Sequence, residues 1–511
     1  MKKRSILILI ATIWAMMAQA QIEVRTEAQT TTASGEHAPL WLNANRHGLS
    51  SLEKTSGYVR AGMFRDSRQD SCKAVRWGLG LDMAATSGFT SDLVLQQAYA
   101  EVGLMKGLLT IGCKEQPMEL KNQELSTGAQ TLGINARPVP QVRLSLPDYW
   151  DIPGTRGWIG FKGHLSYGLT SDDEWQRDFT QEQTRYTEHA ALHTKAGYAR
   201  LGRKDKPLTV EIGLEMAAQF GGKSYLQTNS TELSCISNEG GLKGMWHALM
   251  PSGHDAIEND MDYKNIDGNH LGSWLVRINY DREDWGLSLY GDHFFEDQSQ
   301  MFHLDYDGYG TGDEWNEWKS HDWLLYDFRD MLVGAELRLK ASPWVSNIVV
   351  EYIYSKYQSG PIYHDHTRHL PDHIGGNDNY YNHWVFTGWQ HWGQVMGNPL
   401  YRSPLYNDDA RILVEDNRFR AFHIAAAGTP LEGLHYRLMC TWQRGFGTYD
   451  KPLSHPMRNV SLMGEATYRF PASTAFSGWS VRGALGLDRG SLLGDNFGLQ
   501  LTIGKTLTVG R

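Results

Sequence analysis

The sequence predicts an all-β protein, a transmembrane antiparallel β-barrel of about 16–18 strands with long extracellular loops and short periplasmic turns. Three observations carry this prediction: an N-terminal export signal, apolar residues at every second position through most of the chain, and connections of two very different lengths. Alternating segments of about ten residues suit strands that cross a bilayer at a tilt. One large barrel can use the whole chain of 511 residues.

Residues 1–20 have the composition of a signal peptide. A positive start (Lys2 to Arg4) precedes an apolar run over residues 6–17, and Ala18-Gln19-Ala20 forms a small-residue cleavage site. We expect cleavage after Ala20, which leaves residues 21–511 as one barrel domain. Loss of three cationic residues changes the formal charge from −9 to −12. Nucleic acid is therefore not an expected partner, because its phosphates favour basic surfaces.

Apolar residues alternate with polar ones in ten clear segments. Such alternation predicts strands with one apolar face. In a soluble sandwich that face would point inward, whereas in an outer-membrane barrel it contacts lipid and the polar face lines the lumen. Aromatic residues at segment ends favour the barrel, because they form girdles at membrane interfaces. The segments are 75–83, 159–169, 208–220, 274–280, 333–339, 348–354, 434–442, 460–470, 479–487 and 499–509.

The predicted connections fall into a short and a long class. Short turns at one end and long loops at the other are typical of outer-membrane barrels. After residue 20 no window approaches the roughly 20 apolar residues of a membrane helix. Residues 36–55 and part of 114–140 do not alternate, and we expect helical or irregular inserts there. The short connections are 281–284, 340–344 and 429–433, and the long ones are 114–141, 171–187, 222–268, 297–322 and 358–418.

The stretch from 377 to 401 combines aromatic rings with side-chain amides and contains one charged residue, Asp378. Rings cover the C–H face of a sugar and amides pair with its hydroxyls. This composition predicts a polysaccharide-binding site. A packed polar loop or a barrel-wall strand with interfacial aromatic residues has the same composition, and composition alone favours that alternative. The predicted stacking residues are Tyr380, Tyr381, Trp389 and Trp392, and the predicted hydroxyl partners are Asn382, His383, Gln390, His391 and Asn398.

Other polar clusters predict no enzyme, metal site or cofactor. The tract at 363–373 contains four histidines and two aspartates, but it lacks the helical spacing that orients metal ligands, and a solvated loop is favoured. Asp313, Glu314 and Glu317 provide carboxylates of the kind that glycosidases use, without a spacing that indicates the required separation. No nucleophile-elbow, Walker or zinc-protease motif is present. The four cysteines (Cys72, Cys113, Cys235 and Cys440) show no paired spacing, and we expect single thiols on strands.

Several stretches resemble the capsule-assembly Wzi family of outer-membrane proteins. The resemblance implies an 18-stranded outer-membrane barrel that is not an enzyme, with a lectin-like role in holding capsular or exported polysaccharide at the cell surface. The stretches are LQQAYAE at 95–101 with LTIG at 109–112, NARP at 135–138 with PQVR at 140–143 and LPDYW at 146–150, GWIGFKGH at 157–164, and NH at 382–383 with GWQH at 388–391 and MGNPL at 396–400.

The predicted function is therefore non-enzymatic polysaccharide binding by an outer-membrane barrel that supports capsule or exopolysaccharide assembly and attachment. Expected partners are the polysaccharide and outer-membrane lipid. Polar residues on the lumen face fit a porin or sugar channel equally well, and this is the alternative function. A surface glycan hydrolase and a soluble periplasmic β-protein are further alternatives. The sequence leaves the sugar, the conductance of the lumen and the oligomeric state open.

Overall fold

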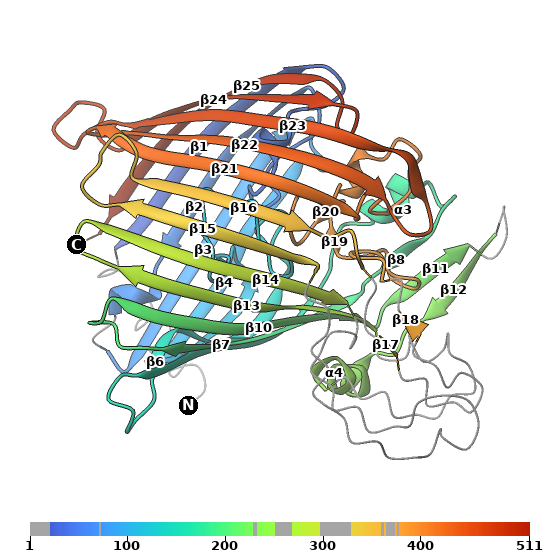
Figure 1. The fold of residues 1–511 in the computed structure, drawn as a ribbon, viewed down its shortest axis with the longest axis horizontal. Helices are drawn as coiled ribbons and strands as arrows, with labels where there is room; N and C mark the ends of the chain where they lie inside the picture. The colour runs from blue at the N-terminus through green and yellow to red at the C-terminus, as the bar shows by residue number, and fades with distance from the viewer. Residues whose placement is uncertain are drawn as a thin grey trace, which may run out of the picture.

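In a computed structural model of the protein, eighteen antiparallel strands form one closed sheet (Figure 1). The structure describes residues 21–70, 73–227, 232–250, 268–296, 329–358, 362–363, 374–375 and 378–510. The predicted fold class is confirmed. The barrel strands are β1 (Ile22–Ser34), β2 (Thr55–Arg65), β3 (Val75–Ser87), β4 (Leu93–Leu104), β5 (Gly107–Cys113), β6 (Gln141–Asp151), β7 (Ile159–Leu169), β9 (Ala191–Leu201), β10 (Leu208–Phe220), β13 (Asn269–Asp281), β14 (Trp285–Glu296), β15 (Met331–Leu339), β16 (Asn347–Tyr354), β21 (Phe419–Leu431), β22 (Leu434–Gly447), β23 (Pro452–Arg469), β24 (Trp479–Gly490) and β25 (Asn496–Val509).

The barrel closes where the first strand pairs with the last. β1 pairs with β25 along its whole length, from Ile22 opposite Val509 to Ser34 opposite Phe497, and it pairs with β2 on its other side. Closure leaves no edge strand with unpaired N–H and C=O groups, which a bilayer would not tolerate. β1 was missed as a strand because its sequence, IEVRTEAQTTTAS, contains few apolar residues.

The side chains on the barrel wall are apolar outside and polar inside. On β3, for example, Leu79, Leu81 and Met83 are exposed on the outer face, whereas Asp82 is buried on the inner face. A soluble sandwich would show the opposite arrangement, so the observed polarity decides between these two readings of the alternation. None of the helices in the described residues is long and apolar enough to cross a membrane.

The two ends of the barrel differ as expected. Both ends of the described chain, at β1 and β25, lie at the end of the barrel that carries short turns such as 105–106, 282–284 and 432–433. The long connections gather at the opposite end, the loop end, on the right of Figure 1. Smaller elements belong to these connections or turns: α2 (Leu40–Asn43), η1 (Ser67–Asp70), α3 (Trp175–Thr180), β8 (Tyr186–Glu188), β11 (Lys223–Gln227), β12 (Leu233–Ser237), α4 (Gly241–Leu249), β17 (Ile362–Tyr363), β18 (Ile374–Gly375), β19 (Gln390–His391), β20 (Gln394–Val395) and η3 (Pro404–Tyr406).

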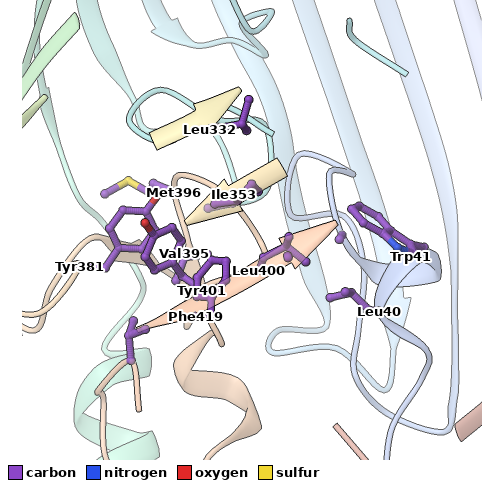
Figure 2. Packing of buried hydrophobic residues seen from close by; sticks show 14 of the residues in the cluster. Leu40, Trp41, Leu332, Ile353, Tyr381, Val395, Met396, Leu400, Tyr401 and Phe419 are labelled. Carbon is purple, nitrogen blue, oxygen red and sulfur yellow. The ribbon is translucent and has the colours of Figure 1, made fainter. Parts of the chain in front are cut away.

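Three connections fold back into the barrel. We call residues 35–54, 114–140 and 378–418 the plug. Many of their buried apolar side chains belong to one large cluster with inward-facing side chains of the wall (Figure 2). Trp41 and Leu400 from the plug, for instance, belong to the same cluster as Leu332 of β15 and Phe419 of β21. The predicted irregular inserts at 36–55 and 114–140 are confirmed, and they fill lumen space with a small apolar core.

Candidate functional site

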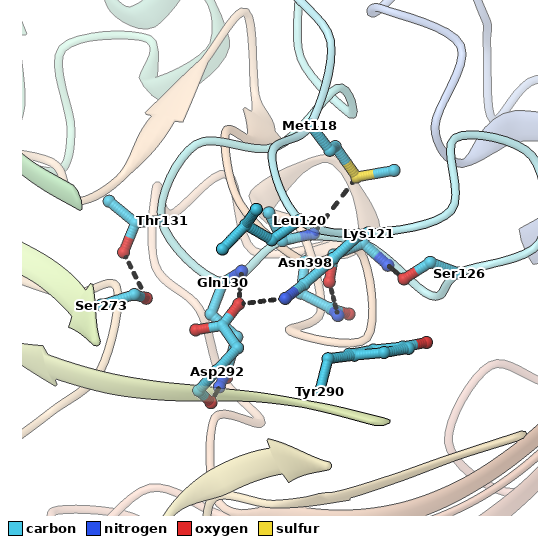
Figure 3. A network of polar contacts seen from close by, with 12 residues as sticks. Met118, Leu120, Lys121, Ser126, Gln130, Thr131, Ser273, Tyr290, Asp292 and Asn398 are labelled. Atoms are coloured by element: carbon cyan, nitrogen blue, oxygen red, sulfur yellow. Dashed lines mark hydrogen bonds and ion pairs between the residues drawn. The ribbon is translucent and has the colours of Figure 1, made fainter. Parts of the chain in front are cut away.

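A buried ion pair fixes the plug to the wall. Nζ of Lys121 lies 2.8 Å from Oδ2 of Asp292 on β14, with side chains 1% and 0% exposed (Figure 3). The same carboxylate oxygen accepts a 3.0 Å hydrogen bond from the backbone N–H of Gln130. Two groups from the plug therefore converge on one wall carboxylate. A charge pair so far from water persists only when its geometry and further hydrogen bonds offset its desolvation.

A second wall carboxylate holds the next turn of the plug. Glu351 of β16 accepts hydrogen bonds from the Ser126 hydroxyl at 2.6 Å and from the Thr127 backbone N–H at 2.7 Å. The Thr127 hydroxyl and the Tyr290 hydroxyl of β14 each donate to it at 2.6 Å. Four donors on one carboxylate stabilise its charged form and set the position of the loop.

The structure places three of the predicted stacking residues in the interior of the protein. Tyr380, Tyr381 and Trp389 are 0%, 0% and 1% exposed and lie inside the plug cluster. The Tyr381 ring lies 4.1 Å from the Tyr401 ring, centroid to centroid, and Nε1 of Trp389 donates a 2.9 Å hydrogen bond to the Thr131 carbonyl. With protein on all sides, these rings offer no free face to a sugar in this structure. The sequence showed the aromatic residues but not which way they face.

The predicted amide partners are likewise engaged within the protein. Asn382 donates to the Val414 carbonyl and accepts from the Val414 N–H, at 2.9 and 2.8 Å. Asn398 donates to the Gly128 carbonyl at 3.0 Å, and Gln390 accepts from the Gly393 N–H at 2.9 Å. These amides satisfy the backbone of an irregular segment, for which strand partners are lacking. Each of these three amides therefore has hydrogen-bond partners within the protein.

The three remaining predicted residues differ in accessibility. His391 is buried, with Nδ1 2.9 Å from the Arg137 carbonyl oxygen, and burial lowers its pKa. His383 and Trp392 are half-buried. Nδ1 of His383 accepts from the Val385 N–H at 3.1 Å. The guanidinium of Arg137 covers one face of the Trp392 ring, 4.2 Å from its centroid. Of the predicted set, only His383 and Trp392 therefore retain some surface for a ligand.

A cavity of about 740 Å³ at the loop end was not predicted from the sequence. It forms where the plug meets the connections around β23, β24 and β25. Its apolar lining comes from Leu453, Met457 and Leu492. At Gly490 and Gly494 the lining consists of backbone atoms. Its polar lining comes from Glu36, Arg402, Glu415, Asp416, Ser491 and Asp495. These residues come from four separate parts of the chain, so no single motif identifies them.

The polar groups of this cavity include both hydrogen-bond donors and acceptors. Arg402 donates to Glu415 Oε2 at 2.9 Å and to the Tyr406 carbonyl at 2.6 Å. Its Nε is buried and has no hydrogen-bond acceptor among the described residues. Glu36 and Asp495 are exposed carboxylates, and Ser491 contributes an exposed hydroxyl. Carboxylate acceptors beside a guanidinium and a hydroxyl suit a ligand rich in hydroxyl groups.

Asp416 lines this cavity, and its carboxyl predicts a pH dependence. Burial raises the pKa of its carboxyl from the usual 3.8 to about 7, and its Oδ1 accepts a 2.7 Å hydrogen bond from the Gly447 N–H. Because the folded-state pKa is raised above the unfolded value, the carboxyl stabilises the folded loop end at low pH. This contribution is lost as the pH rises through about 7. We expect Asp416→Asn to abolish it, as measured by hydrogen exchange of the Gly447 amide between about pH 4 and pH 8, corrected for intrinsic rates.

The matched control for this prediction is Asp409→Asn, which alters an exposed carboxylate of the same connection. We expect its exchange profile to follow that of the wild type. The pH dependence assigned to Asp416 would be contradicted if the Gly447 amide of the wild type were not better protected at low pH than at high pH. It would also be contradicted if Asp416→Asn kept the wild-type dependence of exchange on pH.

A second cavity, of about 500 Å³, lies in the lumen on the other side of the plug. Glu23, Arg25 and Asp66 line it, which places it toward the end with the termini. Several of its charges are paired, as in Lys114 with Glu101 at 2.6 Å. This cavity is a polar vestibule below the plug.

Several minor expectations concern cysteines and metals. Cys113 on β5, Cys235 on β12 and Cys440 on β22 are free thiols on strands, as expected, and Cys72 lies outside the described residues. The histidines of the 363–373 tract and the carboxylates at 313–317 also lie outside them. Within the described ranges, no three His, Cys, Asp or Glu side chains are grouped to hold a metal ion.

Comparisons with known proteins place this geometry among outer-membrane barrels. No family model matches the chain. No curated protein matches it either. Among solved structures, it is similar to Wzi of Escherichia coli, an outer-membrane protein involved in group 1 capsule assembly and described as a carbohydrate-binding β-barrel. The match has 12% identity and a TM-score of 0.57, and it covers 99% of this chain and 88% of Wzi. The fold resembles the Wzi barrel.

Two further solved structures, both from Pseudomonas aeruginosa, also match. OccK5 (OpdH) has 10% identity, a TM-score of 0.46 and coverage of 96% of this chain and 98% of its own. OccK3 (OpdO) has 11% identity, a TM-score of 0.45 and coverage of 97% and 98%. The match to Wzi confirms, at the level of the fold, the resemblance to the Wzi family that the sequence indicated. The protein is a closed 18-stranded barrel of the outer-membrane type.

Proposed function

We propose that this protein is a non-enzymatic outer-membrane barrel that binds polysaccharide at its loop end and supports the attachment of capsule or exopolysaccharide to the cell surface. The observation that carries the proposal is the plug, which fills lumen space with a packed core and buried ion pairs. A lumen occupied in this way favours binding at the mouth over passage through the barrel. The similarity to Wzi, a carbohydrate-binding barrel, supports the same function.

The loop-end cavity is the proposed binding site. Its volume of about 740 Å³ lies within the range of about 300–1,000 Å³ usual for ligand pockets. Glu36, Glu415 and Asp495 outnumber Arg402 on its lining, so the site suits a neutral or cationic glycan better than a polyanion. Of the residues proposed from the sequence, His383 and Trp392 remain candidate contacts at the loop end, and the buried members act by shaping the plug.

The test compares one bulky substitution at the two ends of the barrel. Ser491→Trp places a large ring in the cavity from an exposed position. Ser477→Trp makes the same change at an exposed position in the turn between β23 and β24, at the opposite end. We expect Ser491→Trp to weaken binding of the purified protein to the host's surface polysaccharide by tenfold or more, which corresponds to about 1.4 kcal/mol or more. Ser477→Trp should bind as the wild type does.

The cellular readout is the ratio of cell-bound to shed polysaccharide. We expect shed material to rise in a deletion strain and in a strain carrying Ser491→Trp, with total synthesis unchanged. The wild type and Ser477→Trp should restore the bound fraction. A deletion strain with a normal ratio would overturn the proposed function. If shed material rises in the deletion strain and Ser491→Trp restores the bound fraction, only the location of the site would be overturned.

A further inference from the structure

Helix α4 (Gly241–Leu249) packs against the outer face of the barrel wall. Its Ala248 and Met245 belong to one apolar cluster with Ala218 and Phe220 of β10. On β10 the exposed residues Leu208 and Ile212 mark the outward face, and because side chains alternate, Ala218 and Phe220 lie on that same face. The helix therefore covers lipid-side surface at the loop end, not lumen (Figure 1).

The contact between α4 and the wall is close and specific. A Cβ on Gly244 would meet the Glu239 carbonyl oxygen at 2.6 Å and the Phe220 ring at 3.1 Å, so the glycine permits close approach both to the preceding turn and to β10. The Tyr167 hydroxyl of β7 donates a 2.8 Å hydrogen bond to the Met245 carbonyl. Nζ of Lys195 on β9 donates to the Leu249 carbonyl. The helix is thus attached to three neighbouring strands.

Lys195 explains why the wall is covered at this point. It lies on the outward face of β9, six residues from the exposed outward residue Leu201. A lysine on the lipid face of a barrel is destabilising, most strongly at the bilayer centre and less near the interface. The C-terminal carbonyl of α4 accepts its ammonium hydrogen bond, where the helix dipole also favours a cation.

The opposite side of α4 is an exposed apolar stripe. Leu242 and Trp246, four residues apart on one face of the helix, are 85% and 58% exposed, and Met250, directly after the helix end, is 53% exposed. Lys243 and His247 lie to one side of this stripe, and both contact Glu239, at 2.8 and 2.9 Å. The helix therefore has two apolar faces, one packed against the wall and one directed away from it. Its polar and charged residues, Lys243 and His247, lie between these two faces. A helix in water would not show this pattern, whereas a helix between a barrel wall and lipid would.

We propose that α4 is an interfacial anchor whose Leu242, Trp246 and Met250 insert into the outer boundary of the lipid bilayer. The partner is a lipid surface because the stripe continues the exposed apolar surface of the neighbouring wall, including Ile212 of β10 and Leu169 of β7. Tryptophan is the residue enriched at this depth of a membrane. The anchor would fix the height and orientation of the loop end above the membrane, and it does not depend on which ligand binds there.

The test follows the fluorescence of Trp246 in the full-length protein reconstituted into phosphatidylcholine vesicles. The Trp246 signal is the difference between wild type and Trp246→Phe. We expect acyl-brominated phosphatidylcholine to remove most of this signal, and aqueous iodide to leave it nearly unchanged. The matched control is Trp384, a 68% exposed ring of the plug, whose signal by Trp384→Phe difference should be quenched by iodide and not by brominated lipid.

A second variant tests the orientation of the helix. Lys243→Trp in the Trp246→Phe background moves the ring three positions along the helix, to one side of the apolar stripe, and we expect it to become sensitive to iodide. Quenching of Trp246 by iodide instead of brominated lipid would show that the stripe faces water and would overturn the proposal. Protection of Trp246 from both quenchers would show that protein covers it, such as a second copy of this chain, and would overturn it equally.

Discussion

Replacing Asp292 by alanine is expected to release the plug from the barrel wall. The substitution leaves the Lys121 ammonium buried without its counter-charge and removes the acceptor of the Gln130 N–H. Breaking a buried ion pair from one side costs about 3–5 kcal/mol, because an uncompensated charge remains away from water. The plug would then exchange between docked and loosened states, and the lumen would conduct ions. Planar-bilayer conductance measures this directly, with bursts in Asp292→Ala and a closed wild type.

Two variants sharpen this experiment. Lys121→Met combined with Asp292→Ala removes both charges, and we expect it to restore much of the docking that Asp292→Ala loses. Asp281→Asn breaks a pair with Lys340 at the short-turn end, where both side chains are about half exposed, and such pairs contribute about 0–1 kcal/mol. The Asp281→Asn barrel should therefore show no conductance, as expected for the wild type. A wild-type barrel with steady conductance would contradict the prediction and support the porin alternative.

Replacing Trp389 by alanine is expected to destabilise the plug by about 3–5 kcal/mol, the usual cost of truncating a buried tryptophan. The ring is buried in the same cluster as Met396 and Val395, and its Nε1 hydrogen bond to Thr131 ties the 378–418 segment to the 114–140 segment. The eighteen-stranded wall does not depend on this contact. Hydrogen exchange should therefore accelerate in both plug segments while the amides of β22 and β23 keep their protection.

The control for this prediction is Trp384→Ala. Trp384 is 68% exposed in the same connection, and a surface substitution of this kind changes stability by about 0.5 kcal/mol or less. Glycan binding separates the roles further, because Trp389→Ala should weaken it only in proportion to the loosening of the plug. Ser491→Trp should weaken binding with the plug intact. Weaker glycan binding by Trp389→Ala without faster hydrogen exchange in the plug would indicate that the ring contacts the ligand directly.

Much of the wall followed from local sequence. The alternation between Leu208 and Phe220 predicts a strand because side chains on a strand point to opposite faces in turn. The same signal is weak in β1, where threonines and small residues face outward, and that strand was recognised only from its pairing with β2 and β25. The irregular insert within residues 114–140 was also predictable, because these residues show neither helical nor strand periodicity.

The candidate site was less predictable because it depends on long-range packing. Tyr381 and Trp389 have the composition of a sugar-binding stretch, yet the plug turns their rings toward the wall. The loop-end cavity is lined by Glu36, Arg402 and Ser491. These residues lie far apart in the sequence and share no motif. Only closure of the barrel, which places the first and last strands side by side, brings Glu36 next to the 491–495 connection.

By itself, the sequence determined the alternation that makes a strand wall and the separation into short turns and long loops, because each of these depends on neighbouring residues alone. The export signal stays a prediction from the sequence. The tertiary structure decided which face of that wall meets lipid, which long loops enter the lumen, and which aromatic residues remain accessible. Those outcomes depend on contacts between distant segments, such as Lys121 with Asp292. Burial of a side chain is a property of such contacts, and a residue's type alone does not specify it.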